Sequence, residues 1–106
     1  MVENRINSDI ILNRRWIILK KLNSNCIVVA LSIMDYDKDL GFTEGRGTNK
    51  EEIMEKSRLS LSTVNRSLKL LIEQGLVKEA IKQINKKAYY VTQDGLDKIK
   101  EIRDIE

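Results

Sequence analysis

The stretch that decides the fold spans residues 52–77 and reads EIMEKSRLSLSTVNRSLKLLIEQGLV. The apolar residues of its second half have helical spacing, and they are Val64, Leu68, Leu71 and Ile72. Ser60 or Ser62 can cap this helix, and Gly75 stands where a left-handed residue commonly ends one. The pattern therefore predicts a helix over about 62–74.

A shorter helix precedes it, from about residue 50 to residue 57, and buries Ile53 and Met54. Its start has a capping-box pattern, formed by Thr48 or Asn49 with Glu51 or Glu52. Only a few residues separate the two predicted helices, so they are expected to be joined by a tight turn.

After Leu76 the apolar residues change to a period of two, which is typical of strands. Residues 85–87 read as a turn, and residues 88–92 form a clear second strand. The segment 77–92 is therefore predicted to be a β-hairpin. Thr92 can cap a last helix that runs from residue 93 to about residue 103.

The first half of the chain predicts two more helices. Residues 9–22 have a wide apolar face, and residues 26–34 are expected to form a helix that continues through the charged segment 35–39, capped by Ser24 or Asn25. The glycine-rich residues 41–47 read as a loop. We divide the chain into an N-terminal helix, 1–23, and one domain, 24–106.

Two short helices, a tight turn and a β-hairpin occur in the order of a winged helix-turn-helix. Residues 52–77 closely resemble the helix-turn-helix of winged-helix transcription regulators, particularly those of the multiple-antibiotic-resistance repressor (MarR) type. The matching features are Ile53, the run Leu-Ser-x-Ser-Thr-Val at 59–64, Arg66, Leu68, Leu71, the ending Gly75-Leu76-Val77, and the segment 89–96. The resemblance covers roughly residues 48–102. It implies a mainly α fold with a small β-hairpin, here a winged helix-turn-helix with an extra N-terminal helix.

The second helix has the side chains that a DNA-reading helix needs. A turn of 100° per residue places Ser62, Arg66 and Lys69 on the face opposite Val64, together with Glu73 and flanked by Thr63 and Asn65. Arginine can bond guanine O6 and N7, and asparagine can bond adenine N6 and N7. On the same reasoning Leu70 is expected to project toward the outward side.

The positive charge is concentrated in this half of the chain. Residues 60–90 contain six basic and two acidic residues, a local charge of +4. The candidate DNA-binding residues are Ser60, Ser62, Thr63, Asn65, Arg66, Lys69, Lys86 and Lys87. The two last lysines are placed at the tip of the hairpin, the wing, where they would meet phosphates or the minor groove.

Composition excludes several other functions. The chain of 106 residues has no histidine and one cysteine, which removes histidine catalysis, disulfides within the chain and most zinc sites. We expect no enzyme activity, no catalytic residue, no cofactor and no metal. The absence of a sorting signal indicates a cytoplasmic protein, and Cys26 is expected to be a small buried residue.

Two partners follow from these predictions. The first is double-stranded DNA, read in the major groove by residues 62–74 and contacted by the basic wing, 77–92. The second is another copy of the chain, because residues 9–22 are apolar on more than one side and a small core covers only one. The alternative is an N-terminal helix that packs entirely on its own domain. No membrane partner is expected. The alternative function is a winged-helix module that assembles a protein complex without reading DNA. The operator and any small-molecule effector stay open.

Overall fold

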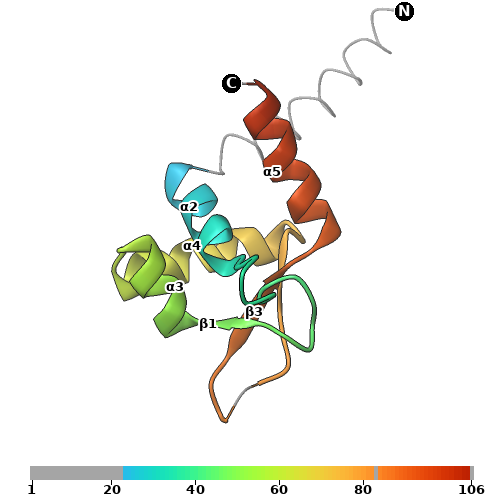
Figure 1. The fold of residues 1–106 in the computed structure, drawn as a ribbon. Coiled ribbons are helices and arrows are strands. Elements are labelled where there is room, and N and C mark those ends of the chain that lie inside the picture. The colour runs from blue at the N-terminus through green and yellow to red at the C-terminus, as the bar shows by residue number, and fades with distance from the viewer. Residues whose placement is uncertain (1–22, 83, 106) are drawn as a thin grey trace, which may run out of the picture.

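The computed structural model describes residues 23–82 and 84–105, and its elements follow the order shown in Figure 1. They are α2 (Ser24–Ile33), β1 (Thr48–Asn49), α3 (Lys50–Ser57), α4 (Leu61–Glu73), β2 (Val77–Glu79), β3 (Ala88–Val91) and α5 (Gln93–Ile105). The helix expected over residues 9–22 lies outside the described residues. Among the described helices, none is both long enough and apolar enough to span a membrane.

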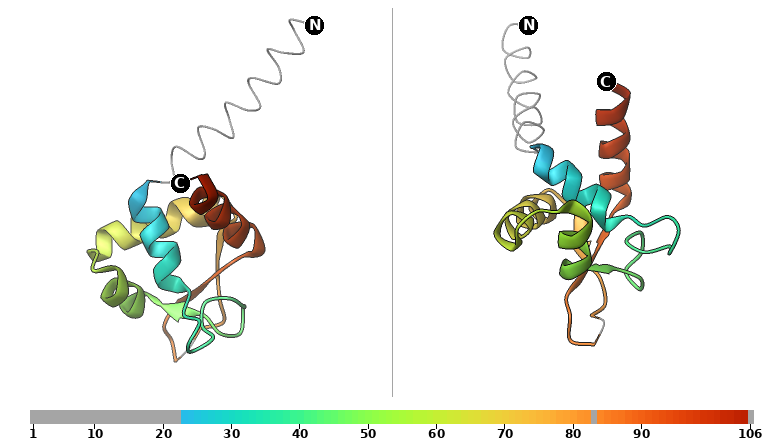
Figure 2. Two further views of the ribbon diagram at one scale, coloured as in Figure 1. Left: turned by 45° about the horizontal axis from the view of Figure 1, so that its top comes forward. Right: turned by 60° about the vertical axis from the view of Figure 1, so that its left-hand side comes forward.

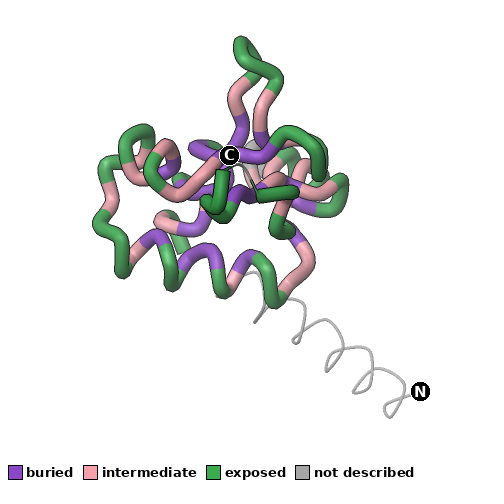
Figure 3. Tube along the Cα trace, turned by 90° about the horizontal axis from the view of Figure 1, so that it is seen from below, coloured by how far each residue is buried: buried purple, intermediate pink, exposed green. Residues whose placement is uncertain are grey.

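One apolar core holds these elements together. It is built from helices α2, α3 and α4 and from the strands, and its largest fully buried side chains include Val29, Ile33, Ile53, Val64 and Val91. The tube in Figure 3 shows the buried segments gathered in the middle of the domain, with exposed residues at the loop tips and outer helix turns. Burial of apolar surface in this core is the main source of stability.

Helix α2 confirms the expected helix but corrects both of its ends. Asn23 caps it, since its Oδ1 accepts a hydrogen bond from the Cys26 backbone N–H at 3.0 Å, so neither Ser24 nor Asn25 is the cap. The helix ends at Ile33 and does not continue through residues 35–39. Asp35 and Leu40 instead exchange backbone hydrogen bonds of 2.9 and 3.0 Å, which close a turn over that segment.

The helix-turn-helix is formed by α3 and α4, as predicted. Asn49 caps α3 and Ser60 caps α4, which decides between the alternative caps at both helices. Arg58, between the helices, has a left-handed φ of 60°, and its backbone N–H bonds Met54 O. This left-handed residue ends α3 and turns the chain toward α4 within a few residues.

The sheet has one strand more than the predicted hairpin. Its order is β1-β3-β2, with Thr48 opposite Tyr89 and Val77 opposite Val91. Thr48 is fully buried, and its hydroxyl donates a 2.6 Å hydrogen bond to Ile33 O at the end of α2. Strand β1 therefore attaches the start of α3 to both the wing and α2.

The hairpin differs from the prediction at its tip. Strand β2 is only three residues long, and the left-handed residues of the turn are Ile84 and Asn85, with φ values of 49° and 66°. Lys86 and Lys87 therefore follow the turn and lead into β3, so they are not its tip. Figure 2 shows this wing at the end of the domain opposite the C-terminal part of α5.

Two other features of the second half are settled by the backbone. Gly75 has a φ of 72°, which confirms the left-handed residue expected after α4. Thr92 Oγ1 accepts a hydrogen bond from the Gly95 N–H at 3.0 Å, as expected for the residue that caps α5.

The expectation that Leu70 projects outward from α4 was wrong. Its side chain is half-buried and packs against the core cluster.

Candidate nucleic-acid interface

The outer face of α4 has free hydrogen-bonding groups. Its buried residues, Val64, Ser67, Leu68 and Leu71, all lie on one side, whereas Ser62, Asn65, Arg66, Lys69 and Glu73 are exposed. No side-chain hydrogen bond or ion pair links Asn65, Arg66 or Lys69 to another residue in the described part of the chain. The predicted face is thus formed by one helix, and its polar groups are available to a ligand.

The start of α4 has a cluster of three hydroxyl groups. Ser60 Oγ accepts a hydrogen bond from the Thr63 backbone N–H at 3.3 Å and lies 2.9 Å from Thr63 Oγ1 and 3.3 Å from Ser62 Oγ. Ser60 is therefore fixed as the helix cap. The first turn contains no acidic residue, so the positive end of the helix dipole is not neutralised within its own helix.

The two predicted wing lysines have acidic partners. Lys86 Nζ lies 3.1 Å from Glu51 Oε2 at the start of α3, and Lys87 Nζ lies 3.6 Å from Glu79 Oε1 on β2. All four side chains are well exposed, so each ion pair contributes only about 0–1 kcal/mol to stability. Such weak pairs can exchange an acidic partner for a phosphate at low cost.

A groove of about 340 Å³ separates the second half of α4 from the wing. Its lining includes Lys50, Asn65, Lys69, Glu73, Glu79 and Lys87. The structure thus brings Asn65 and Lys69 together with Lys87 and adds Lys50 from the start of α3. Lys50 could not be placed in this groove from the sequence, because the pairing of β1 with β3 that fixes its position is long-range.

Two further lysines of the wing contribute to the local positive charge but were not among the predicted DNA-binding residues. Lys78 and Lys82 are exposed and have no acidic partner in the described part of the chain. By contrast, Arg46 donates to Asp39 O at 3.0 Å and to Lys38 O at 2.9 Å, so its guanidinium holds the 35–46 loop together.

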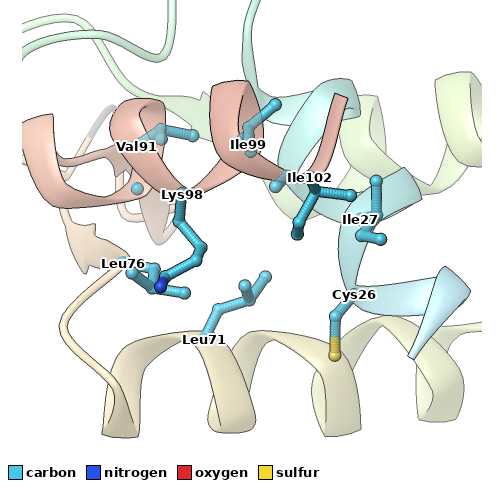
Figure 4. Close-up of a pocket in the computed structure, with 10 residues that line it drawn as sticks. Cys26, Ile27, Leu71, Leu76, Val91, Lys98, Ile99 and Ile102 are labelled. Carbon is cyan, nitrogen blue, oxygen red and sulfur yellow. The ribbon is translucent and has the colours of Figure 1, made fainter. Parts of the chain in front are cut away.

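Cys26 lies away from this face. It lines a cavity of about 10 Å³ with Leu71, Val91 and Ile99, shown in Figure 4, which is too small to hold a ligand. Burial raises the pKa of the Cys26 thiol, which opposes formation of the reactive thiolate. Among the described residues, no three His, Cys, Asp or Glu side chains are arranged to hold a metal ion.

Comparisons with known proteins agree with this geometry. A family model described as winged helix-turn-helix matches residues 39–106. The DNA-binding protein TubR of Clostridium botulinum C phage is 40% identical over 60 residues, which are 57% of this chain and 74% of that protein. The solution structure of the DNA-binding TubR fragment from Clostridium botulinum is 33% identical, with a TM-score of 0.56, over 76% of this chain and 94% of the fragment.

Two other solved structures share the fold at lower identity. A mutant of MepR from S. aureus is 14% identical with a TM-score of 0.63, and the match covers 96% of this chain and 74% of that one. NMB1585, a MarR family regulator from Neisseria meningitidis, is 22% identical with a TM-score of 0.58, over 97% and 68% of the two chains. The expected likeness to the MarR type is thereby confirmed for the fold.

The fold, the free basic face of α4 and the matched segment together define a DNA-binding regulator of the winged-helix class. The chain belongs to the winged helix-turn-helix family.

Proposed function

We propose that the chain is a transcription regulator that reads a specific sequence of double-stranded DNA. Helix α4 lies in the major groove, and the wing, residues 77–92, lies on the neighbouring backbone. The observation that carries this proposal is the exposed outer face of α4, where Asn65, Arg66 and Lys69 have no hydrogen-bond or ion-pair partner in the described part of the chain. The TubR relatives support it, because their names describe them as DNA-binding.

The residues of α4 divide into reading and positioning roles. Arg66 is suited to guanine and Asn65 to adenine, since each offers two hydrogen bonds to one base edge. The first turn of α4, with the hydroxyls of Ser60, Ser62 and Thr63, is suited to a phosphate because helix N-termini attract anions. Lys69 adds positive charge on the same face.

The wing lysines hold the backbone. In the free protein Lys86 pairs with Glu51 and Lys87 pairs with Glu79. Both glutamates are exposed to solvent, so each lysine can bind a phosphate without leaving a buried, unpaired carboxylate. Such contacts give affinity without sequence information. We propose that the chain acts by binding DNA, without a catalytic residue or a cofactor. Because its proposed ligand is DNA, we propose that the protein acts in the cytoplasm.

Electrophoretic mobility of duplex DNA over a salt series tests the function. We expect binding to random duplexes that weakens steeply as salt rises, and tighter binding to an operator obtained by selection from a random pool. Binding to random DNA alone would contradict sequence reading. No binding to any duplex would favour a protein-interaction module instead.

We also propose a homodimer in which residues 9–22 contribute to the contact. The support comes from an apolar groove of about 560 Å³ between α2 and α5, lined among others by Ile27, Leu31, Leu96 and Ile99. Along the chain, helix α2, which forms one side of this groove, directly follows residues 9–22. Two recognition helices would then contact successive major grooves about 34–36 Å apart.

Sedimentation equilibrium of the full chain tests the dimer. Leu31→Glu should shift the protein toward monomer, because Leu31 is 50% exposed in the groove and a charge there opposes apolar contact. Ile81→Glu is the matched control, since Ile81 is 61% exposed but lies on the wing. A chain that begins at Asn23 and still dimerises equally well would remove residues 9–22 from the interface.

A further inference from the structure

Leu61 is an apolar residue at a position where neither the core nor the helix cap requires one. It is the first residue of α4, its side chain is 50% exposed, and it is absent from the core cluster. The neighbouring Leu59 packs against that cluster, and Ser60 provides the cap. The exposed leucine therefore contributes little to folding, although it lies at the N-terminal end of α4, the end of a recognition helix whose residues contact base edges in helix-turn-helix proteins.

Leu61 and Asn65 lie on the same flank of α4. They are four residues apart, so the helix places them one above the other with a separation of about 6 Å along its axis. Asn65 is exposed and lines the groove between α4 and the wing. Ile72 continues this flank toward the other end of the helix and is 40% exposed.

The chemistry of the major groove has one apolar partner for such a leucine. The C5-methyl group of thymine is the apolar feature among base edges that otherwise display hydrogen-bond donors and acceptors. Cytosine in its place would present an N4 amino group, whose hydrogen bonds to water a leucine side chain would remove without replacing. An exposed leucine beside the bases therefore favours thymine over cytosine.

We propose that Leu61 is a specificity-determining residue that contacts a thymine methyl group, close to the base bonded by Asn65. The flank formed by Leu61 and Asn65 then reads neighbouring A·T pairs, whereas Arg66 reads guanine on the outer face. This proposal rests on the proposed function and adds to it the identity of one base.

The test removes the methyl group from DNA and the leucine from the protein. Each thymine of the selected operator is replaced in turn by deoxyuridine, which lacks only the C5-methyl group. The wild-type protein should bind about fourfold more weakly at one position of a half-site, as expected when one methyl contact is lost. The Leu61→Ala variant should bind the thymine operator more weakly and lose its response to deoxyuridine at that position.

Two further variants separate this contact from a general effect. Ile72→Ala removes an exposed apolar residue from the same flank and should keep the wild-type response to deoxyuridine. Leu61→Gln keeps most of the side-chain length but should change the base preferred at that position when selection is repeated. Thermal unfolding of each variant checks that its fold is unchanged.

Each outcome decides the matter. Equal losses for wild type and Leu61→Ala at every thymine would overturn the role of Leu61 while leaving sequence reading intact. Equal weakening of operator and random DNA by Leu61→Ala would also overturn it. Failure of the wild-type protein to select any operator would overturn the proposed function itself.

Discussion

The starts of the two helices in the helix-turn-helix differ in how their dipoles are balanced. At α3, Asn49 and Glu52 bond each other reciprocally, at 2.9 Å through the Glu52 N–H and at 3.1 Å through the Asn49 side-chain amide. Glu51 and Glu52 add negative charge to the first turn of α3. The first turn of α4 has only the Ser60 cap and no acidic residue. Helix α3 is thus neutralised within the protein, whereas α4 leaves its positive end to a ligand.

The other end of α3 shows the same pattern. Lys56 lies in its last turn and forms a 2.8 Å ion pair with Asp35, while the last turn of α4 contains no basic residue. The two helices therefore have separate tasks. The charges at both ends of α3 are paired within the protein, whereas α4 presents unpaired groups outward.

The outer face of α4 should respond most strongly to mutation. Arg66→Ala should weaken binding to the selected operator by about 1–3 kcal/mol, because the variant loses two hydrogen bonds to one base. Arg66→Lys keeps the charge but not the paired geometry, so it should recover only part of the loss. Binding isotherms measure both.

A matched change on α3 provides the control. Glu55 is exposed on α3, and Glu55→Ala should not weaken operator binding, because α3 is expected to support α4 without reading bases. If Arg66→Ala and the wild type bound the selected operator with equal affinity, Arg66 would not contact a base. The proposed difference between a base-contacting α4 and a supporting α3 would then be contradicted.

Mutation of the wing should have the second-largest effect on DNA binding. Replacing both Lys86 and Lys87 by alanine should weaken operator and random DNA similarly and reduce the slope of log affinity against log salt by about two per bound subunit. The control is Lys38→Ala, which removes a positive charge from the exposed 35–40 turn and should leave the slope unchanged. An unchanged slope in the wing variant would place these lysines off the DNA.

The two caps should separate stability from binding. Asn49→Ala and Ser60→Ala should each lower the free energy of unfolding by about 1 kcal/mol, measured by urea unfolding. Only Ser60→Ala should also weaken DNA binding in mobility shifts, because its helix start faces the ligand. If both variants lost affinity to the same degree, the contrast between the two helix starts would be structural only.

The sequence predicts features that depend on neighbours along the chain. The caps Asn49 and Ser60 and the left-handed Gly75 were all among the predicted residues, because caps and periods are local signals. Strand β1 was missed, since two residues give no period and their pairing with β3 is long-range. Leu70 was placed outward because a helical wheel does not show which neighbouring element covers a flank.

The candidate site divides in the same way. The outer face of α4, with Arg66 and Lys69, follows from helical spacing alone. The ion pair of Lys86 with Glu51 joins residues 35 positions apart, and no local pattern indicates it. The position of Lys50 in the groove beside Asn65 depends likewise on how the sheet is assembled.

The smallest expected effect concerns the ion pair between Asp35 and Lys56 at the end of α3, which makes stability depend on pH. The hydrogen bond from Lys56 holds the pKa of Asp35 below its ordinary value of 3.8, with a further contribution from the Lys38 backbone N–H. The folded pKa is lower than the unfolded one, so this stabilisation is fully present above the unfolded pKa and is lost as pH falls through the folded pKa.

Asp35→Asn should therefore lower the free energy of unfolding at pH 7. The free energy of unfolding of the variant should also fall less than that of the wild type below about pH 4, where aspartates of ordinary pKa take up protons. Lys56→Ala should have the same effect, and the double variant should add little because both changes break one interaction. Urea unfolding over a pH series measures this, and mobility shifts at pH 7 should show no change in operator affinity. A loss of affinity in Asp35→Asn would mean that the charges of α3 also serve the ligand, which would contradict the separation of tasks between α3 and α4.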